Sequence, residues 1–158
     1  MKKAIYPGSF DPFTNGHLDI VKKAAALFEH VYIVIGINSG KKRTYDACAM
    51  KAAMDETLRL LKLDNCEVCI HEGLVAEFAK NNDIHYMIRG LRNNMDYNYE
   101  ENIAMVNKLI NPDLESIFFR AENAALSSSM VKELSGYGLE IGQYVPEPVL
   151  RCVQELKK

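Results

Sequence analysis

Residues 6–17, Tyr-Pro-Gly-Ser-Phe-Asp-Pro-Phe-Thr-Asn-Gly-His, have the residue types and spacing of a phosphate-binding turn. A short apolar segment runs into Gly8, and the pair Gly16-His17 opens an amphipathic helix. Glycines let the backbone approach a ligand closely, and the first turn of a helix offers unpaired N–H groups at its positive dipole end. A histidine at that end can add a donor to a bound phosphate. The segment therefore predicts a nucleotide-phosphate site that includes His17.

A basic run, Ser39-Gly40-Lys41-Lys42-Arg43, follows the apolar segment 31–37, which is typical of a strand buried on both faces. Read alone, a basic loop of this kind is most often a solvated surface. Its position after the second predicted strand, close to the turn that follows the first, favours contact with an anionic ligand. Both interpretations stay open at this level.

Arg89 and Arg92 flank Gly90 at the end of another predicted strand. Two arginines at this spacing can converge on anionic oxygens, because the planar guanidinium fork suits phosphate. The alternative is a pair of structural ion pairs with Asp96 or Glu100.

Three consecutive serines, Ser127, Ser128 and Ser129, stand at the start of a further predicted helix. Serines at this place can cap the helix, or their hydroxyl and N–H groups can bind the β- and γ-phosphates of a nucleotide. The remaining histidines, at positions 30, 71 and 85, have no companions at catalytic or metal spacing, so we interpret them as structural or surface residues.

Strand-like and helix-like segments alternate along the chain. Beside 4–6 and 31–37, the strand candidates are Cys66 to His71, Tyr86 to Arg89 and Ser116 to Phe119. Apolar stripes at helical spacing predict helices between them, among them Leu18-Val21-Ala25-Phe28 and Ile103-Val106 with Leu109 or Ile110. Two more helices are predicted from Ser128 to about Ser135 and from Glu147 to Leu156.

This alternation predicts one α/β domain over residues 1–158, with a Rossmann-like, doubly wound, mostly parallel five-stranded sheet and helices on both faces. In such sheets, ligands bind beyond the carboxyl ends of the strands, where the strand order reverses. The four polar clusters all follow predicted strands. We therefore expect them to meet at one rim of the sheet.

The composition is that of a globular protein, with 48% hydrophobic and 25% charged residues. The formal charge of −2 argues against a nucleic-acid partner, because such partners favour a basic surface. We expect no signal peptide and no membrane span, hence a cytoplasmic protein. Cys66 and Cys69 have redox-motif spacing, but in a strand this offset puts the sulfurs on opposite faces, so all four cysteines are predicted to be free thiols.

The segment Thr14-x-Gly16-His17 resembles the (His/Thr)-x-Gly-His signature of the nucleotidyltransferase superfamily. The full run 6–17 is similar to that of one branch, the phosphopantetheine adenylyltransferases. The block Arg89-Gly-Leu-Arg92 followed by Asp96-Tyr-x-Tyr-Glu100 is similar to the second signature of that branch, and 126–129 is similar to the Ile-Ser-Ser-Ser/Thr motif of the superfamily. The resemblance covers essentially the whole chain.

The resemblance implies the site residues as well as the fold. It makes His17 the catalytic residue and places the acceptor substrate against Ser9, Lys41, Leu74, Val75 and Arg89. It places ATP against the following residues: Ser9, Phe10, His17, Gly90, Leu91, Arg92, Glu100, Asn123, Ala124, Ala125, Leu126, Ser127, Ser128 and Ser129. The chain departs from the family in segment 45–50 and in loop 120–125, which lacks the common aromatic residue.

The implied reaction is ATP + 4′-phosphopantetheine → 3′-dephospho-coenzyme A + pyrophosphate, with Mg²⁺ carried on the triphosphate. The family also implies a homohexamer. A nicotinate-mononucleotide adenylyltransferase or a cytidylyltransferase of the same superfamily is the alternative, since both share the first motif. A non-catalytic nucleotide sensor on the same scaffold would bind ATP without releasing pyrophosphate.

Overall fold

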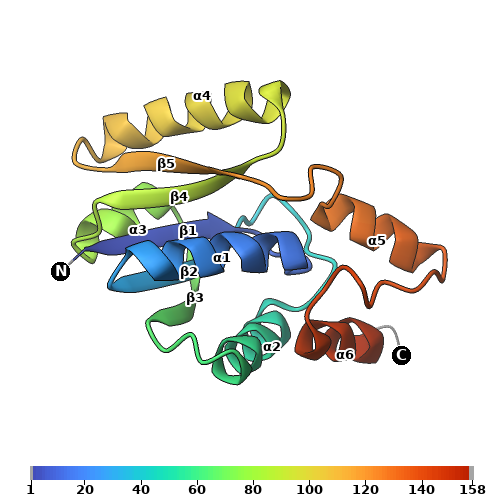
Figure 1. Ribbon diagram of the computed structural model, residues 1–158. Coiled ribbons are helices and arrows are strands. Elements are labelled where there is room, and N and C mark those ends of the chain that lie inside the picture. Colours follow the sequence, from blue (N-terminus) through green and yellow to red (C-terminus); the bar gives the residue numbers. More distant parts are fainter. Residues whose placement is uncertain (1, 157–158) are drawn as a thin grey trace.

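The computed structural model describes residues 2–156, in which strands and helices alternate up to a final pair of helices (Figure 1). The strands are β1 (Lys3–Gly8), β2 (His30–Ile37), β3 (Cys66–Glu72), β4 (Tyr86–Leu91) and β5 (Glu115–Arg120). The helices are α1 (Asn15–Leu27), α2 (Ala47–Leu60), α3 (Val75–Asn81), α4 (Asn94–Ile110), α5 (Ser128–Gly136) and α6 (Glu147–Leu156). Each predicted strand is present and extends one or two residues beyond its predicted bounds.

The strands form one sheet in the order β3-β2-β1-β4-β5, and every pairing between described strands is parallel. The chain moves outward from β1 to β3 and then returns to the other side of β1 with β4. The strand order therefore reverses between β1 and β4, which is the place where doubly wound sheets bind ligands. The predicted fold class is confirmed.

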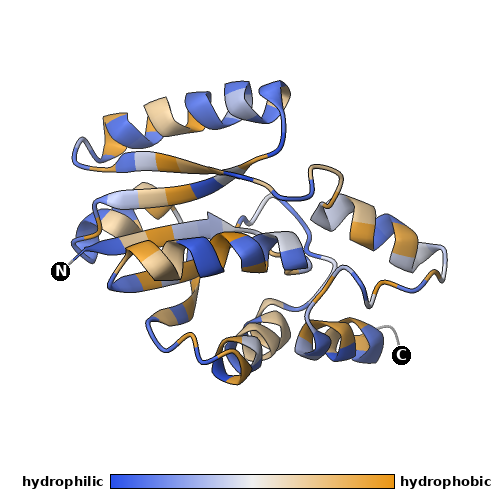
Figure 2. Cartoon of the chain, viewed as in Figure 1, coloured by the Kyte–Doolittle hydropathy of each residue, from blue (hydrophilic) through white to orange (hydrophobic). Residues whose placement is uncertain are grey.

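Helices cover both faces of the sheet, because alternate strand residues point to opposite faces. In β1, Ala4 and Tyr6 join a core with α1, α2, α5 and α6, whereas Ile5 joins a second core with α3. Figure 2 shows hydrophobic and hydrophilic residues alternating along the helices. The two apolar layers hold β1 rigidly in the middle of the molecule.

Helix α4 lies over β4 and β5 at one edge of the sheet, and its predicted apolar stripe is only partly buried (Figure 1). The prediction for Val106 was wrong: its side chain is 55% exposed, and that of Leu109 is 83% exposed. The half-buried stripe is instead Ile103, Asn107 and Ile110. A helix at the edge of a sheet covers fewer strands, so it buries a narrower stripe than a central one.

The cysteines are free, as predicted, and Cys66 and Cys69 pack on opposite faces of the sheet. Among residues 2–156, no helix is both long and apolar enough to cross a bilayer.

Candidate active site

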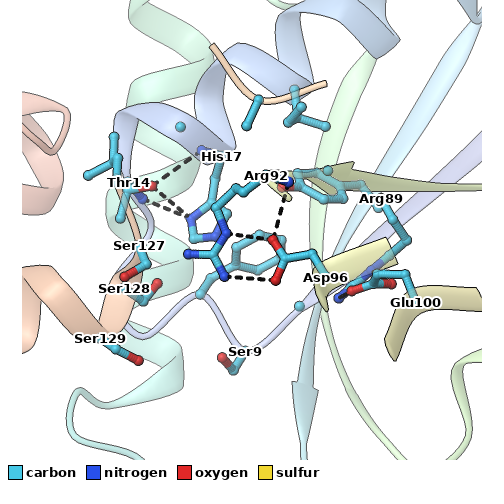
Figure 3. Close-up of a pocket in the computed structure, with 18 of the residues that line it drawn as sticks. Ser9, Thr14, His17, Arg89, Arg92, Asp96, Glu100, Ser127, Ser128 and Ser129 are labelled. Carbon is cyan, nitrogen blue, oxygen red and sulfur yellow. Dashed lines mark hydrogen bonds and ion pairs between the residues drawn. The ribbon is translucent and has the colours of Figure 1, made fainter. Parts of the chain in front are cut away.

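A cleft of about 500 Å³ opens at the carboxyl ends of β1 and β4, where the strand order reverses. It brings together the loop after β1, the end of β4, the start of α4 and the start of α5 (Figure 3). Its lining includes Ser9, Phe10, Thr14, His17, Arg89, Gly90, Arg92, Asp96, Glu100, Asn123, Leu126, Ser127, Ser128 and Ser129. Three of the four predicted polar clusters therefore meet in one cavity.

His17 is held by a capping box at the start of α1. Thr14 is the N-cap residue, and its hydroxyl accepts a hydrogen bond from the backbone N–H of His17 at 3.3 Å. In return, Nδ1 of His17 accepts one from the backbone N–H of Thr14 at 3.0 Å. The Thr-x-x-His spacing thus provides acceptors for two backbone N–H groups at the helix start. It also fixes the orientation of the imidazole.

Three aromatic rings surround the imidazole of His17. Phe10 meets it edge to face with ring centres 5.0 Å apart, Phe13 stacks on it at 5.7 Å, and Tyr6 lies at 6.4 Å. Burial, together with the positive charges of Arg89 and Arg92, lowers the pKa of His17 to about 3.

The imidazole is therefore neutral near pH 7. Because Nδ1 of His17 accepts the backbone N–H of Thr14, we assign the ring proton to Nε2. The ring can then donate one hydrogen bond toward the cleft that it lines.

Phe10 has a φ of 47°, in the left-handed backbone region. This conformation is energetically unfavourable for a residue with a bulky side chain. This conformation turns its ring back over Gly8. A Cβ atom on Gly8 would come within 3.0 Å of the Phe10 ring, so only glycine fits there without a shift. The glycine of the first motif therefore makes room for the ring that packs on His17.

Arg89 projects from β4 into the same region and donates hydrogen bonds from all three of its side-chain nitrogens. Its Nε and Nη2 atoms donate to the two carboxylate oxygens of Glu100, both at 2.7 Å, and Nη1 donates to the carbonyl of Pro7. Burial alone would lower the pKa of Arg89, but the hydrogen bonds and charge of Glu100 outweigh burial and raise it. Arg89 is thus a fixed positive charge at the cleft wall.

Arg92 forms the second ion pair, with Asp96 in the first turn of α4. Its Nε lies 2.8 Å from one carboxylate oxygen and Nη2 lies 3.3 Å from the other (Figure 3). The structural ion pairs that the sequence left as an alternative are therefore both present. Both arginines still line the cleft, so pairing and ligand contact do not exclude one another.

The three serines divide between capping and the cleft. Ser127 is the N-cap of α5 and its hydroxyl accepts the N–H of Met130 at 3.1 Å, while Ser128 donates to the carbonyl of Pro12 at 2.8 Å. The first N–H groups of α5, at Ser128 and Ser129, have no intrahelical partner, and both residues line the cleft. This helix start can therefore receive an anion.

A second cavity of about 820 Å³ adjoins the first and shares Ser9 and Arg89 with it. Apolar and amide side chains of several elements line it: Ile37, Asn38, Leu74, Val75, Met87, Tyr99, Ile103 and Asn107. Leu74 and Val75, which the sequence alone would make ordinary core residues, lie at this cavity, and the Leu74 side chain is 52% exposed.

Some predicted site residues do not line either cavity. Lys41 is exposed in the loop after β2, where Asn38 and Ser39 but not Lys41 reach the second cavity. The others outside both linings are Leu91, Ala124 and Ala125.

Sequence reasoning missed one face of α4. Asp96, Tyr99, Ile103 and Asn107 line the cavities at spacings of three or four residues, together with the predicted Glu100. That spacing puts them on one side of a helix, and this signal could have found them.

The other histidines stay away from the cleft, and in residues 2–156 no group of three or more metal-binding side chains is placed to hold an ion. His30, at the start of β2, pairs with Glu67, and His85, just before β4, pairs with Asp83. The cleft itself offers arginine, serine and backbone N–H groups, which suit phosphate oxygens.

The chain is a cytidylyltransferase-like protein, since the model of that family matches residues 5–134. A solved structure from Vibrio parahaemolyticus, provisionally assigned as a nicotinate-nucleotide adenylyltransferase, has the same fold, with a TM-score of 0.71 at 15% identity over 98% of this chain and 93% of that one. A phosphopantetheine adenylyltransferase from Shouchella clausii (strain KSM-K16) is 37% identical over 99% of this chain and 98% of its own length. The chain therefore belongs to the phosphopantetheine adenylyltransferase family.

Proposed function

We propose that this chain transfers AMP from ATP to 4′-phosphopantetheine, giving 3′-dephospho-coenzyme A and pyrophosphate. The observation that carries the proposal is the pair of adjoining cavities. One is lined by His17, arginines and a helix start, and suits a triphosphate. The other is lined mainly by apolar and amide groups, with the charged side chains of Glu72 and Arg89 also in its lining, and suits a long arm that is largely uncharged but not purely apolar.

The reaction needs positioning and charge stabilisation rather than a protein nucleophile. An oxygen of the acceptor phosphate, whose second pKa is about 6, is already largely anionic near pH 7. It attacks the α-phosphorus of ATP, a new P–O bond forms, and the bond from the α-phosphorus to the bridging oxygen of the β-phosphate breaks. Negative charge gathers on the equatorial α-phosphate oxygens during this in-line step.

His17 supports that step by donating from Nε2 to an α-phosphate oxygen. Because Thr14 holds Nδ1, the donor is oriented before the substrate arrives, which is the condition for electrostatic catalysis. Arg89 and Arg92 add positive charge at the wall, and the start of α5 receives the leaving pyrophosphate through its free N–H groups. Lys41 holds the acceptor phosphate from its exposed loop.

Mg²⁺ enters with the triphosphate in this proposal. The ion prefers phosphate oxygens and water to a full protein cage, and the carboxylates of the cleft, Asp96 and Glu100, are both paired with arginines. The chain's own residues then bind the phosphates, and the ion neutralises part of their charge.

The enzyme is further proposed to act as a homohexamer in the cytoplasm. Free thiols at all four cysteines suit a reducing compartment. The exposed side chains of Met105, Val106 and Leu109 on α4 offer an apolar face for a second copy.

A turnover assay with purified protein tests the proposed activity. With MgATP, we expect pyrophosphate release with 4′-phosphopantetheine and little with nicotinate mononucleotide; for the cytidylyltransferase alternative, CTP replaces ATP with a phosphorylated acceptor such as phosphocholine. Preference for either of these alternatives would contradict the proposal. ATP binding without pyrophosphate release would support a nucleotide sensor instead.

A further inference from the structure

Arg43 ends the basic run after β2, yet its side chain is only 16% exposed and turns inward. Its Nε donates to the carbonyl of Tyr45 at 3.0 Å, and its Nη2 donates to the carbonyl of Phe10 at 3.3 Å. Nη1 donates to the carbonyl of Ser9. One guanidinium therefore joins the loop after β2 to the loop after β1.

The buried carboxylate of Asp11, in the loop after β1, also joins the two loops. Asp11 accepts the backbone N–H groups of Thr44 and Tyr45, both at 2.8 Å, and lies 3.7 Å from Nη2 of Arg43. Lys132 of α5 approaches the same carboxylate at 3.8 Å. The loop after β2 thus donates hydrogen bonds both to the backbone carbonyls and to the Asp11 carboxylate of the loop after β1. The positive charge of Arg43 strengthens these contacts.

Two of the three carbonyls that Arg43 holds, those of Ser9 and Phe10, lie in the loop after β1 where the backbone has a positive φ. Phe10 has φ at 47°, and its ring packs edge to face on His17 with centres 5.0 Å apart. A bulky residue stays in the left-handed region only where its surroundings impose it. Arg43 donates to the carbonyls of the two peptide groups that flank Phe10, and so fixes the ring that packs on the imidazole.

We propose that Arg43 is a positioning residue for His17, acting through the Ser9–Phe10 backbone and the Phe10 ring. The proposal rests on the proposed function for its effect on turnover, but the packing of His17 can be measured without it. It also gives Arg43 a task distinct from that of Lys41. Lys41 is exposed and free to meet a ligand, while Arg43 ties the loop that carries Lys41 to the loop that carries Ser9.

The test compares the wild type with Arg43→Ala and Arg43→Lys, using the ¹⁵N chemical shifts of the histidine rings across a pH titration. In the wild type, His17 should stay neutral down to about pH 4, because its pKa lies near 3. In Arg43→Ala, the Phe10 ring should no longer be held in place, so water should reach the His17 imidazole. The loss of burial should raise the pKa of His17 by at least one unit. His30 and His85 lie outside both cavities and serve as internal references.

The kinetic arm separates positioning from binding. For Arg43→Ala, kcat should fall roughly 10- to 100-fold while the KM for ATP stays within about threefold, because a small misplacement acts mainly on the transition state. Arg43→Lys should recover little, since an ammonium cannot span the three carbonyls. Added guanidinium at a non-denaturing concentration should partly restore Arg43→Ala but not His17→Gln.

Arg151→Ala is the matched control, because Arg151 also pairs with a carboxylate, Glu56, at 2.8 Å but lies on α6 outside both cavities. It should change neither the His17 titration nor kcat. If Arg43→Ala does not fold, Arg43→Lys carries both measurements. An unchanged His17 titration in a folded Arg43 variant overturns the proposal, even if the chain proves to have another activity.

Discussion

The two nitrogens of the His17 ring have separate tasks. Nδ1 completes the cap of α1 with Thr14, and Nε2 is left for a ligand. Substitution by glutamine separates these tasks, because a glutamine at this third helical position can still accept the Thr14 N–H. His17→Gln should keep the fold.

His17→Gln should lower kcat roughly 100-fold or more, with the KM for ATP changed only by a small factor, because the Nε2 contact strengthens in the transition state. Steady-state kinetics of wild type, His17→Gln and His17→Ala measure this. His17→Ala should lose catalysis to a similar degree and also lose stability with its cap. Equal losses in ATP binding and turnover would contradict the assigned role.

The low pKa of His17 also predicts how the free energy of unfolding depends on pH. In the unfolded chain the ring takes up a proton below about pH 6.5, whereas in the folded protein it does so only near pH 3. The unfolded state therefore binds more protons in this window, and stability falls as the pH falls.

Urea unfolding of wild type and His17→Gln from pH 8 to pH 4 tests this dependence. Between about pH 5.5 and pH 4.5 the wild type should lose roughly 1.4 kcal/mol more than the variant per pH unit. The two curves should run parallel above pH 7. Parallel curves throughout would show that the ring is not buried as a neutral group.

Lys41→Ala tests the acceptor side. Because the side chain is exposed and bonded to nothing in the described structure, its loss should leave stability unchanged within about 0.5 kcal/mol. The KM for 4′-phosphopantetheine should rise, with that for ATP little changed. Lys42→Ala, the exposed neighbour, is the control and should leave both constants near the wild-type values.

Among the elements, α5 shows how a helix start combines stability with binding. Ser127 caps the helix through its hydroxyl, whereas the Ser129 hydroxyl has no protein partner among the described residues. Ser127→Ala should therefore lower the free energy of unfolding by about 1 kcal/mol. Ser129→Ala should leave stability within about 0.5 kcal/mol of wild type and weaken ATP binding instead. Urea unfolding and calorimetric ATP titration of both variants measure the contrast.

The central elements were predictable because their patterns were strong. The apolar run 31–37 indicated a buried strand, and the segment after β1 indicated a phosphate-binding turn. Because β1 and β2 are neighbours in the sheet, the loops that follow them lie close together. Helix α4 was less predictable, since Val106 and Leu109 follow the helical period but lie on its exposed side. The inward turn of Arg43 had no sequence signal, because it depends on carbonyls more than thirty residues away.

At the scale of the whole molecule, the exposed apolar side chains of α4 gather where the sheet ends. Leu109, Met105 and Val106 are 83%, 62% and 55% exposed, and a groove of about 450 Å³ runs beside them between α4 and β5. In the proposed homo-oligomer, another copy would cover this face.

Leu109→Asp should therefore reduce the assembly mass measured by sedimentation velocity. The subunit should remain folded, because the Leu109 side chain makes little contact within its own chain. The far-ultraviolet circular dichroism of the variant should therefore match that of the wild type. Leu27→Asp is the matched control: Leu27 ends α1 and is 64% exposed, but lies outside the α4 groove. Loss of mass in both variants, or in neither, would show that α4 is not the surface that joins the copies.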